Sequence, residues 1–175
     1  FEASVGGGIP ILHPLTQCMA ANRIDEVYGI LNGTTNYILT RMVRTGAFFS
    51  DALREAQAKG YAEADPSADI DGDDIRRKLC ISANIAFDAA LEERAIPTFG
   101  IRTVTAADIA AFKSHGFACK LLARAESAEG GVCAYVEPAL VGADDLEAAV
   151  PANFNLITYE AEKLGRQSFY GQGAG

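Results

Sequence analysis

Six carboxylates and one lysine crowd a short stretch of this 175-residue chain, between Gly60 and Lys78. Pro66 and Gly72 interrupt the stretch, and apolar residues then recur at helical spacing, so the pattern predicts a loop followed by a helix that begins near Gly72 and ends near Phe87. On that helix Asp74 lies one turn before Lys78. The two side chains are therefore expected on one face, with a carboxylate beside an ammonium.

Two interpretations of this cluster are open. The first is a solvated acidic loop, a helix capped by Asp71 and an ordinary ion pair worth roughly 0.2 to 0.5 kcal/mol. The second is a polar pocket in which carboxylates bind a cationic group and orient Lys78, whose ammonium can donate a proton. Spacing alone does not decide between them.

Composition limits the classes of protein. The hydrophobic content of 49% is enough for one core, which predicts a single domain over residues 1–175. A net charge of -8 disfavours nucleic acid and anionic membranes as partners, because both attract basic surfaces. The four cysteines stand far apart, which predicts buried thiols of a reducing compartment and hence a cytoplasmic protein. They are Cys18, Cys80, Cys119 and Cys133.

The elements that must position the cluster follow from periodicity and caps. Helices are expected over 10–21, after Asn32, over 50–59 with Ser50 as N-cap, and over 105–114 with Thr105 as N-cap. Strands are expected over 24–31, 117–125, 132–141, 153–162 and 167–170. Helices early and strands late predict an α+β fold, with helices packed on one face of a mainly antiparallel sheet. The N-terminus of the helix after Asn32 could hold a carboxylate or phosphate, or could simply be capped by threonine.

Glycines near the two ends suggest close backbone contacts. The run Gly171 to Gly175 imitates part of a dinucleotide fingerprint, but that motif needs a strand before it and a helix after it, and the sequence stops where the helix should begin. Gly6, Gly7 and Gly8 follow Val5 in a passage typical of a strand leading into a helix. The first residues therefore suggest a fragment of a longer chain.

Four stretches in order resemble the signatures of homoserine dehydrogenase: residues 1–10, 29–39, 60–78 and 171–175. The resemblance implies the substrate and dimerisation domain of that enzyme, without its dinucleotide-binding domain. It implies an oxidoreductase that interconverts L-homoserine and L-aspartate 4-semialdehyde with NAD(P)(H), on the route to threonine, methionine and isoleucine, and a homodimer. The fragment alone is then expected to be inactive, and a binding module for amino acids or a dimerisation scaffold is the alternative.

The resemblance also implies roles for individual residues. Lys78 would polarise the aldehyde oxygen and relay its proton, oriented by Asp74, although a second lysine outside this chain could share that role. Substrate contacts would come from Glu63, Asp69, Tyr61, Gly33 and Thr34. Gly6, Gly7 and Gly8 would let the backbone approach the nicotinamide. A monovalent cation such as sodium would bind main-chain oxygens of Glu2, Val5, Gly7 and Ile9.

Overall fold

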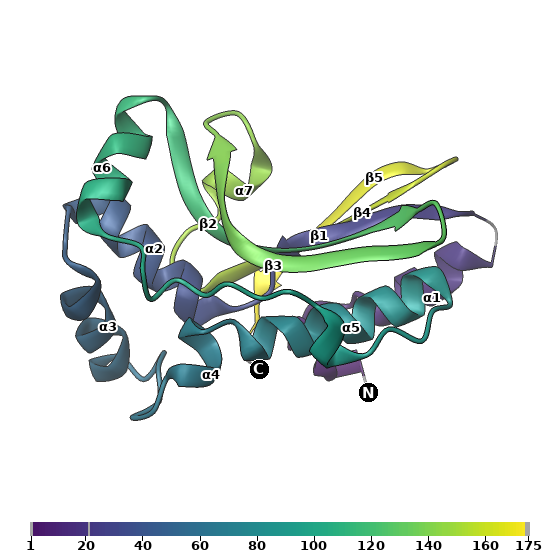
Figure 1. Ribbon diagram of the computed structural model, residues 1–175, viewed down its shortest axis with the longest axis horizontal. Helices are drawn as coiled ribbons and strands as arrows, with labels where there is room; N and C mark the ends of the chain where they lie inside the picture. The colour runs from purple at the N-terminus through teal and green to yellow at the C-terminus, as the bar shows by residue number, and fades with distance from the viewer. Residues whose placement is uncertain (1, 21, 174–175) are drawn as a thin grey trace.

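Five antiparallel strands form the sheet at the centre of the computed structural model, which describes residues 2–20 and 22–173 (Figure 1). The strands lie in the order β3-β2-β1-β4-β5, and every neighbouring pair is antiparallel. Their bounds are Ile24–Ile30 for β1, Phe117–Ala128 for β2, Gly131–Gly142 for β3, Phe154–Ala161 for β4 and Gly165–Gln172 for β5. The predicted α+β class is confirmed.

Seven α-helices surround the sheet in the described part of the chain. They are α1 Leu12–Met19, α2 Gly33–Thr45, α3 Phe49–Ala58, α4 Ser67–Ile70, α5 Asp73–Phe87, α6 Ala106–Ser114 and α7 Leu146–Ala149. Figure 1 shows α1 and α5 along one face of the sheet, while α2, α3 and α4 gather at one end and the short α7 lies on the opposite side. Among the described residues, no helix is long and apolar enough to span a membrane.

The two faces of the sheet differ in chemistry. Strand residues that point towards α5, such as Leu121 and Ile157, are fully or almost fully buried and join the main core with Ile75 and Leu79 of that helix. The opposite face, here called the outer face, has a small apolar cluster of Ile30, Val150 and Leu156. Beside that cluster it is polar, and the guanidinium groups of Arg124 and Arg166 each lie over the Tyr28 ring. The sheet therefore has one core face and one mixed face.

Of the three predicted helix N-caps, one is confirmed and two are wrong. Thr105 caps α6 in a complete capping box with Asp108, as predicted. The predicted N-cap Asp71 is wrong, because Gly72 occupies that position with a left-handed φ of 89°. The predicted N-cap Ser50 is also wrong: α3 begins one residue earlier, after Phe48, whose backbone carbonyl accepts the first helical hydrogen bonds. Helix α1 is shorter than its predicted range of 10–21.

The prediction of four buried thiols is wrong for one cysteine. Cys18 and Cys119 are buried and Cys80 is partly buried, but Cys133 is exposed. Cys133 lies opposite Glu126 on the outer face, where β3 forms the margin of the sheet. Burial raises the pKa of the Cys119 thiol to about 11, so this cysteine stays protonated at neutral pH.

Candidate functional site

Helix α5 places Lys78 at the point where β1 ends. Its ammonium Nζ lies 2.7 Å from Asp74 Oδ2 and donates to the carbonyl oxygen of Leu31 at 3.0 Å. Leu31 directly follows β1, so the lysine is held between its own helix and the strand end. The predicted one-turn pair of Asp74 and Lys78 is confirmed, and the Lys78 side chain is only 19% exposed. An ammonium has three N–H groups, so one remains for a further acceptor.

Asn32 joins this pair to the acidic loop. As N-cap of α2 it accepts a hydrogen bond from the Thr35 amide at 2.9 Å through its side-chain oxygen. Its side-chain nitrogen donates to Asp69 Oδ1 at 2.8 Å and to Asp74 Oδ2 at 2.9 Å. One buried amide thus both starts a helix and holds two carboxylates side by side. Asn32 was not among the predicted site residues, although its place before a helical pattern is typical of an N-cap.

The turn after Asn32 meets the loop that precedes the acidic cluster. The Thr34 hydroxyl donates to the main-chain oxygen of Tyr61 at 2.5 Å. Gly33 lies directly against the backbone of Asn153, because a Cβ at this position would come within 2.6 Å of the Asn153 oxygen. The close packing at this position therefore requires a glycine. Gly33 and Thr34, both predicted from the family resemblance, lie where α2, the loop and the start of β4 converge.

These residues surround a cavity of about 290 Å³ at the end of the sheet where β1 and β5 end and β4 begins. This volume is near the lower limit of ~300 Å³ that is usual for small-molecule pockets. The cavity brings together six of the predicted catalytic and substrate residues, Asp69 among them, with five residues that were not predicted. Its lining consists of Asn32, Gly33, Thr34, Gly60, Tyr61, Asp69, Asp74, Lys78, Asn153, Asn155 and Gly173.

Asn155 is the least expected member of this lining. It is fully buried, and neither its side-chain nitrogen nor its side-chain oxygen has a hydrogen-bond partner within residues 2–20 and 22–173. The backbone of Gly173 lies over it so closely that a Cβ there would meet the amide nitrogen at 2.0 Å. The strand pattern of β4 did not predict a role for Asn155, because residues at alternate positions of this strand, such as Ile157, point into the core.

Four of the six acidic residues of the cluster do not line the cavity, and Glu63 and Asp71 are two of them. Glu63 is exposed on the loop, where the Gln57 side chain donates to its main-chain oxygen at 3.1 Å. Asp71 pairs with Arg102 at 2.7 Å instead of facing Lys78. The hydrogen bond from Arg102 and its charge lower the pKa of the Asp71 carboxyl. Part of the cluster is thus solvated, whereas Asp69, Asp74 and Lys78 line a cavity, and binding of a cationic group there stays a prediction.

The glycine loop lies next to this cavity without lining it. Gly6 and Gly7 have left-handed φ values of 74° and 59°, and Gly8 has open space around its missing side chain. Ile9 packs against Gly171, two residues before the cavity residue Gly173. Ala174 and Gly175 of the glycine-rich run lie outside the described residues.

The glycine loop offers an open backbone but no complete site for a dinucleotide within the described residues. A planar ring could approach the open backbone at Gly8, but the described sheet is antiparallel and has no parallel βαβ unit to hold a whole dinucleotide. The Glu2 main-chain oxygen accepts a weak hydrogen bond from Val5 N at 3.4 Å, and the Glu2 carboxylate accepts from the first amides of α1. Within the described ranges no group of three or more His, Cys, Asp or Glu side chains is placed to hold a metal.

The arrangement suits an amino-acid-sized ligand with a cationic group and a reactive oxygen. Asp69 and Asp74 give the cavity two negative charges against one positive charge on Lys78, which favours an ammonium. The free N–H of Lys78 can donate to an alcohol or aldehyde oxygen. The fold and the cavity together define an α+β domain with a small charged cavity at one end of its sheet.

The comparisons with known proteins identify the family. The family model described as "Homoserine dehydrogenase" matches residues 10–175, and the chain belongs to this family. Homoserine dehydrogenase of Synechocystis is 46% identical over 178 residues, and that of Mycobacterium tuberculosis is 47% identical over 180 residues. The matches take in 99% and 100% of this chain but 41% of either relative, so the chain spans about two fifths of their length.

Solved structures agree with this assignment. The crystal structure of a homoserine dehydrogenase from Thiobacillus denitrificans matches with a TM-score of 0.97 and 42% identity, over 100% of this chain and 41% of that one. A homoserine dehydrogenase from S. aureus matches with a TM-score of 0.85 and 37% identity, over 89% of this chain and 39% of that one. The chain therefore has the fold of one part of these enzymes.

Proposed function

We propose that this chain is the substrate domain of an enzyme that interconverts L-homoserine and L-aspartate 4-semialdehyde with NAD(P)(H). The single observation that supports this most is the pair of Lys78 and Asp74 in one cavity with Asp69, in a chain of the homoserine dehydrogenase family. The dinucleotide would supply the hydride acceptor or donor when bound, and Gly6, Gly7 and Gly8 would let the backbone approach its nicotinamide.

Lys78 is the proposed proton donor for reduction of the aldehyde. Its ammonium donates to the aldehyde oxygen, so that a proton reaches this oxygen as the hydride reaches the carbon, and in the reverse direction the same nitrogen receives the hydroxyl proton. Asp74 Oδ2 at 2.7 Å fixes the position of the Lys78 Nζ. Asp74 is therefore a positioning residue in this mechanism.

Asp69 is the proposed partner of the substrate ammonium, since it lines the cavity beside Asn32. Glu63 shares that role in the proposal, but it is exposed outside the cavity and reaches the ammonium only after a shift of its loop. Gly33, Thr34 and Tyr61 shape the wall that meets the rest of the substrate. Glu63→Gln is expected to raise the KM for homoserine while changing kcat less.

Calorimetry with L-homoserine tests whether the chain binds an amino acid. The purified 175-residue chain is expected to bind homoserine and to show no NAD(P)-dependent oxidation, which should appear only when the chain is joined to a dinucleotide-binding domain. Robust turnover by the chain alone would mean that the cofactor site is misplaced. If neither the isolated chain nor the chain joined to a dinucleotide-binding domain binds homoserine, a dimerisation scaffold is supported instead.

We also propose a homodimer formed through the outer face of the sheet. Tyr170 is 53% exposed there and stacks on Phe154 with ring centroids 5.1 Å apart, next to the small apolar cluster. Light scattering at high micromolar concentration is expected to give a dimer, and Tyr170→Glu is expected to weaken it. Phe48→Ser, at an exposed aromatic residue before α3, is the matched control. A monomeric wild-type protein would refute this proposal.

Two further parts of the proposal concern environment. All four cysteines are free thiols, which supports a location in the reducing cytoplasm.

A sodium ion bound by main-chain oxygens of Glu2, Val5, Gly7 and Ile9 would order the glycine loop. Replacing sodium with a bulky organic cation is expected to lower the thermal stability of the wild-type protein, and an unchanged melting temperature would count against this site.

A further inference from the structure

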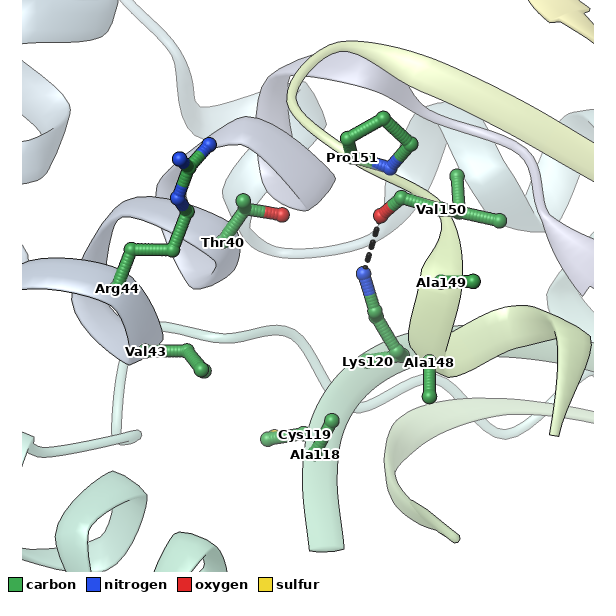
Figure 2. Close-up of a pocket in the computed structure, with 10 residues that line it drawn as sticks. All are labelled: Thr40, Val43, Arg44, Ala118, Cys119, Lys120, Ala148, Ala149, Val150 and Pro151. Atoms are coloured by element: carbon green, nitrogen blue, oxygen red, sulfur yellow. Dashed lines mark hydrogen bonds between the residues drawn. The ribbon is translucent and has the colours of Figure 1, made fainter. Parts of the chain in front are cut away.

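A second cavity, of about 260 Å³, lies between α2, the first residues of β2 and the segment that follows α7 (Figure 2). It shares no lining residue with the candidate active site. One wall is apolar, formed by short side chains such as Val43, Ala118 and Ala149. The polar side chains are Thr40, Arg44 and Lys120, together with the Cys119 thiol, and none of the described Asp or Glu residues lines the cavity.

Lys120 is an unusual residue for this position. It is only 4% exposed, and its ammonium donates to Asn36 Oδ1 at 2.8 Å and to the Val150 carbonyl at 2.7 Å. Both acceptors are neutral, and within the described residues no carboxylate lies within ion-pair distance of Nζ. Burial lowers the pKa of Lys120 to about 8, so the side chain is still mainly charged at neutral pH. A buried cation without an anionic partner is costly, and its third N–H is unused.

Helix α2 supplies two more donors to the same cavity. The Thr40 hydroxyl is buried and has no hydrogen-bond partner in the part of the chain that the structure describes. Figure 2 shows this hydroxyl turned towards the side where Lys120 and Val150 meet. Arg44, one turn later, lines the cavity and forms no ion pair within residues 2–20 and 22–173. In a chain of net charge -8, this is a local excess of positive charge.

We propose that this cavity is a binding site for a small aliphatic carboxylate. One carboxylate oxygen accepts the third N–H of Lys120, the other accepts the Thr40 hydroxyl, and Arg44 adds positive charge at the opening. The hydrocarbon part of the ligand contacts Val43 and Ala118. A phosphate fits less well, because it needs donors around all of its oxygens, whereas here the donors face apolar side chains.

Isothermal titration of the purified protein with butyrate tests the site, with butyramide as the uncharged ligand of equal size and inorganic phosphate as the competing anion. Butyrate is expected to bind in the millimolar range, and amide shifts in NMR spectra should cluster at Thr40, Ala118 and Val150. Butyramide and phosphate should each bind at least about tenfold more weakly. Equal binding of butyrate and butyramide, tighter binding of phosphate, or no saturable butyrate binding would overturn the proposal.

Variants locate the binding and separate it from a structural role of the lysine. Lys120→Met and Thr40→Val are each expected to weaken butyrate binding about tenfold or more. Thr45→Val is the matched control on the same helix, because the Thr45 hydroxyl donates to the Arg41 carbonyl and does not line the cavity. If Lys120→Met fails to fold, Thr40→Val decides, and unchanged butyrate affinity in folded Thr40→Val would refute the site.

Discussion

Asn32→Asp should separate the two tasks that one amide performs. An aspartate at this position keeps the oxygen that accepts the Thr35 amide, and Asp is as good an N-cap as Asn. It replaces the nitrogen that donates to Asp69 at 2.8 Å and to Asp74 at 2.9 Å with a third carboxylate oxygen. The helix start is thus preserved while the link between the two carboxylates is lost.

The expected cost follows from these two hydrogen bonds. A hydrogen bond to a charged group contributes about 1.5 to 3 kcal/mol, and the lower value applies here because the Asp74 side chain is 31% exposed. Two lost bonds give about 3 kcal/mol of unfolding free energy, and repulsion among three carboxylates adds to this loss. Asn32→Ser keeps a cap and adds no charge, so it should lose less.

Urea unfolding at neutral and at acid pH measures both effects. The deficit of Asn32→Asp should shrink on acidification, because a protonated carboxyl group again supplies a donor and removes repulsion, whereas the deficit of Asn32→Ser should change little. Free energies of unfolding within about 0.5 kcal/mol of the wild-type value for both variants would refute the bridging role of Asn32.

Three further changes have distinct expected outcomes. Gly33→Ala should destabilise the protein by about 1 to 3 kcal/mol and impair homoserine binding, because its Cβ would meet the Asn153 oxygen at 2.6 Å; a stable variant with normal binding in calorimetry would contradict this. Lys120 has a pKa of about 8 in the folded state and an ordinary value of 10.5 when unfolded, so its burial makes stability rise with pH between these values, by on the order of 3 kcal/mol. The pKa of Cys119 is raised from 9.0 to about 11, so this thiol makes stability fall with pH between 9 and 11 and opposes the effect of Lys120. Lys120→Met should abolish the rise of stability in thermal melts recorded over a series of pH values. An unchanged profile would show that Lys120 is not buried as a cation. Asp71→Asn should lower the free energy of unfolding by well under about 1 kcal/mol and leave kcat unchanged, since its partner Arg102 lies outside the cavity. A large loss of kcat would place Asp71 in the site.

The sequence predicted the features that depend on local periodicity. The spacing of Ile75 and Leu79 located α5, and the one-turn spacing of Asp74 and Lys78 predicted their ion pair. Alternation predicted the strands well because one face of the sheet is buried in the core.

Contacts between distant segments could not be predicted from spacing. Asn32 reaches Asp69 and Asp74 across 37 and 42 residues, and the buried state of Lys120 depends on Asn36, 84 residues away. No local pattern specifies such contacts. The wrong prediction of Asp71 as N-cap has the same cause, because Asp71 binds Arg102 across 31 residues instead of capping α5.

The most direct test of the central claim is the kcat for homoserine oxidation of Lys78→Ala, in an enzyme that joins this chain to a dinucleotide-binding domain. If the Lys78 ammonium donates to the reacting oxygen, kcat should fall roughly a hundredfold or more while the thermal melt confirms a folded protein. Asp74→Asn should show a milder fall, because Lys78 keeps its bond to the Leu31 carbonyl at 3.0 Å. A folded Lys78→Ala enzyme with near-normal kcat would contradict the account.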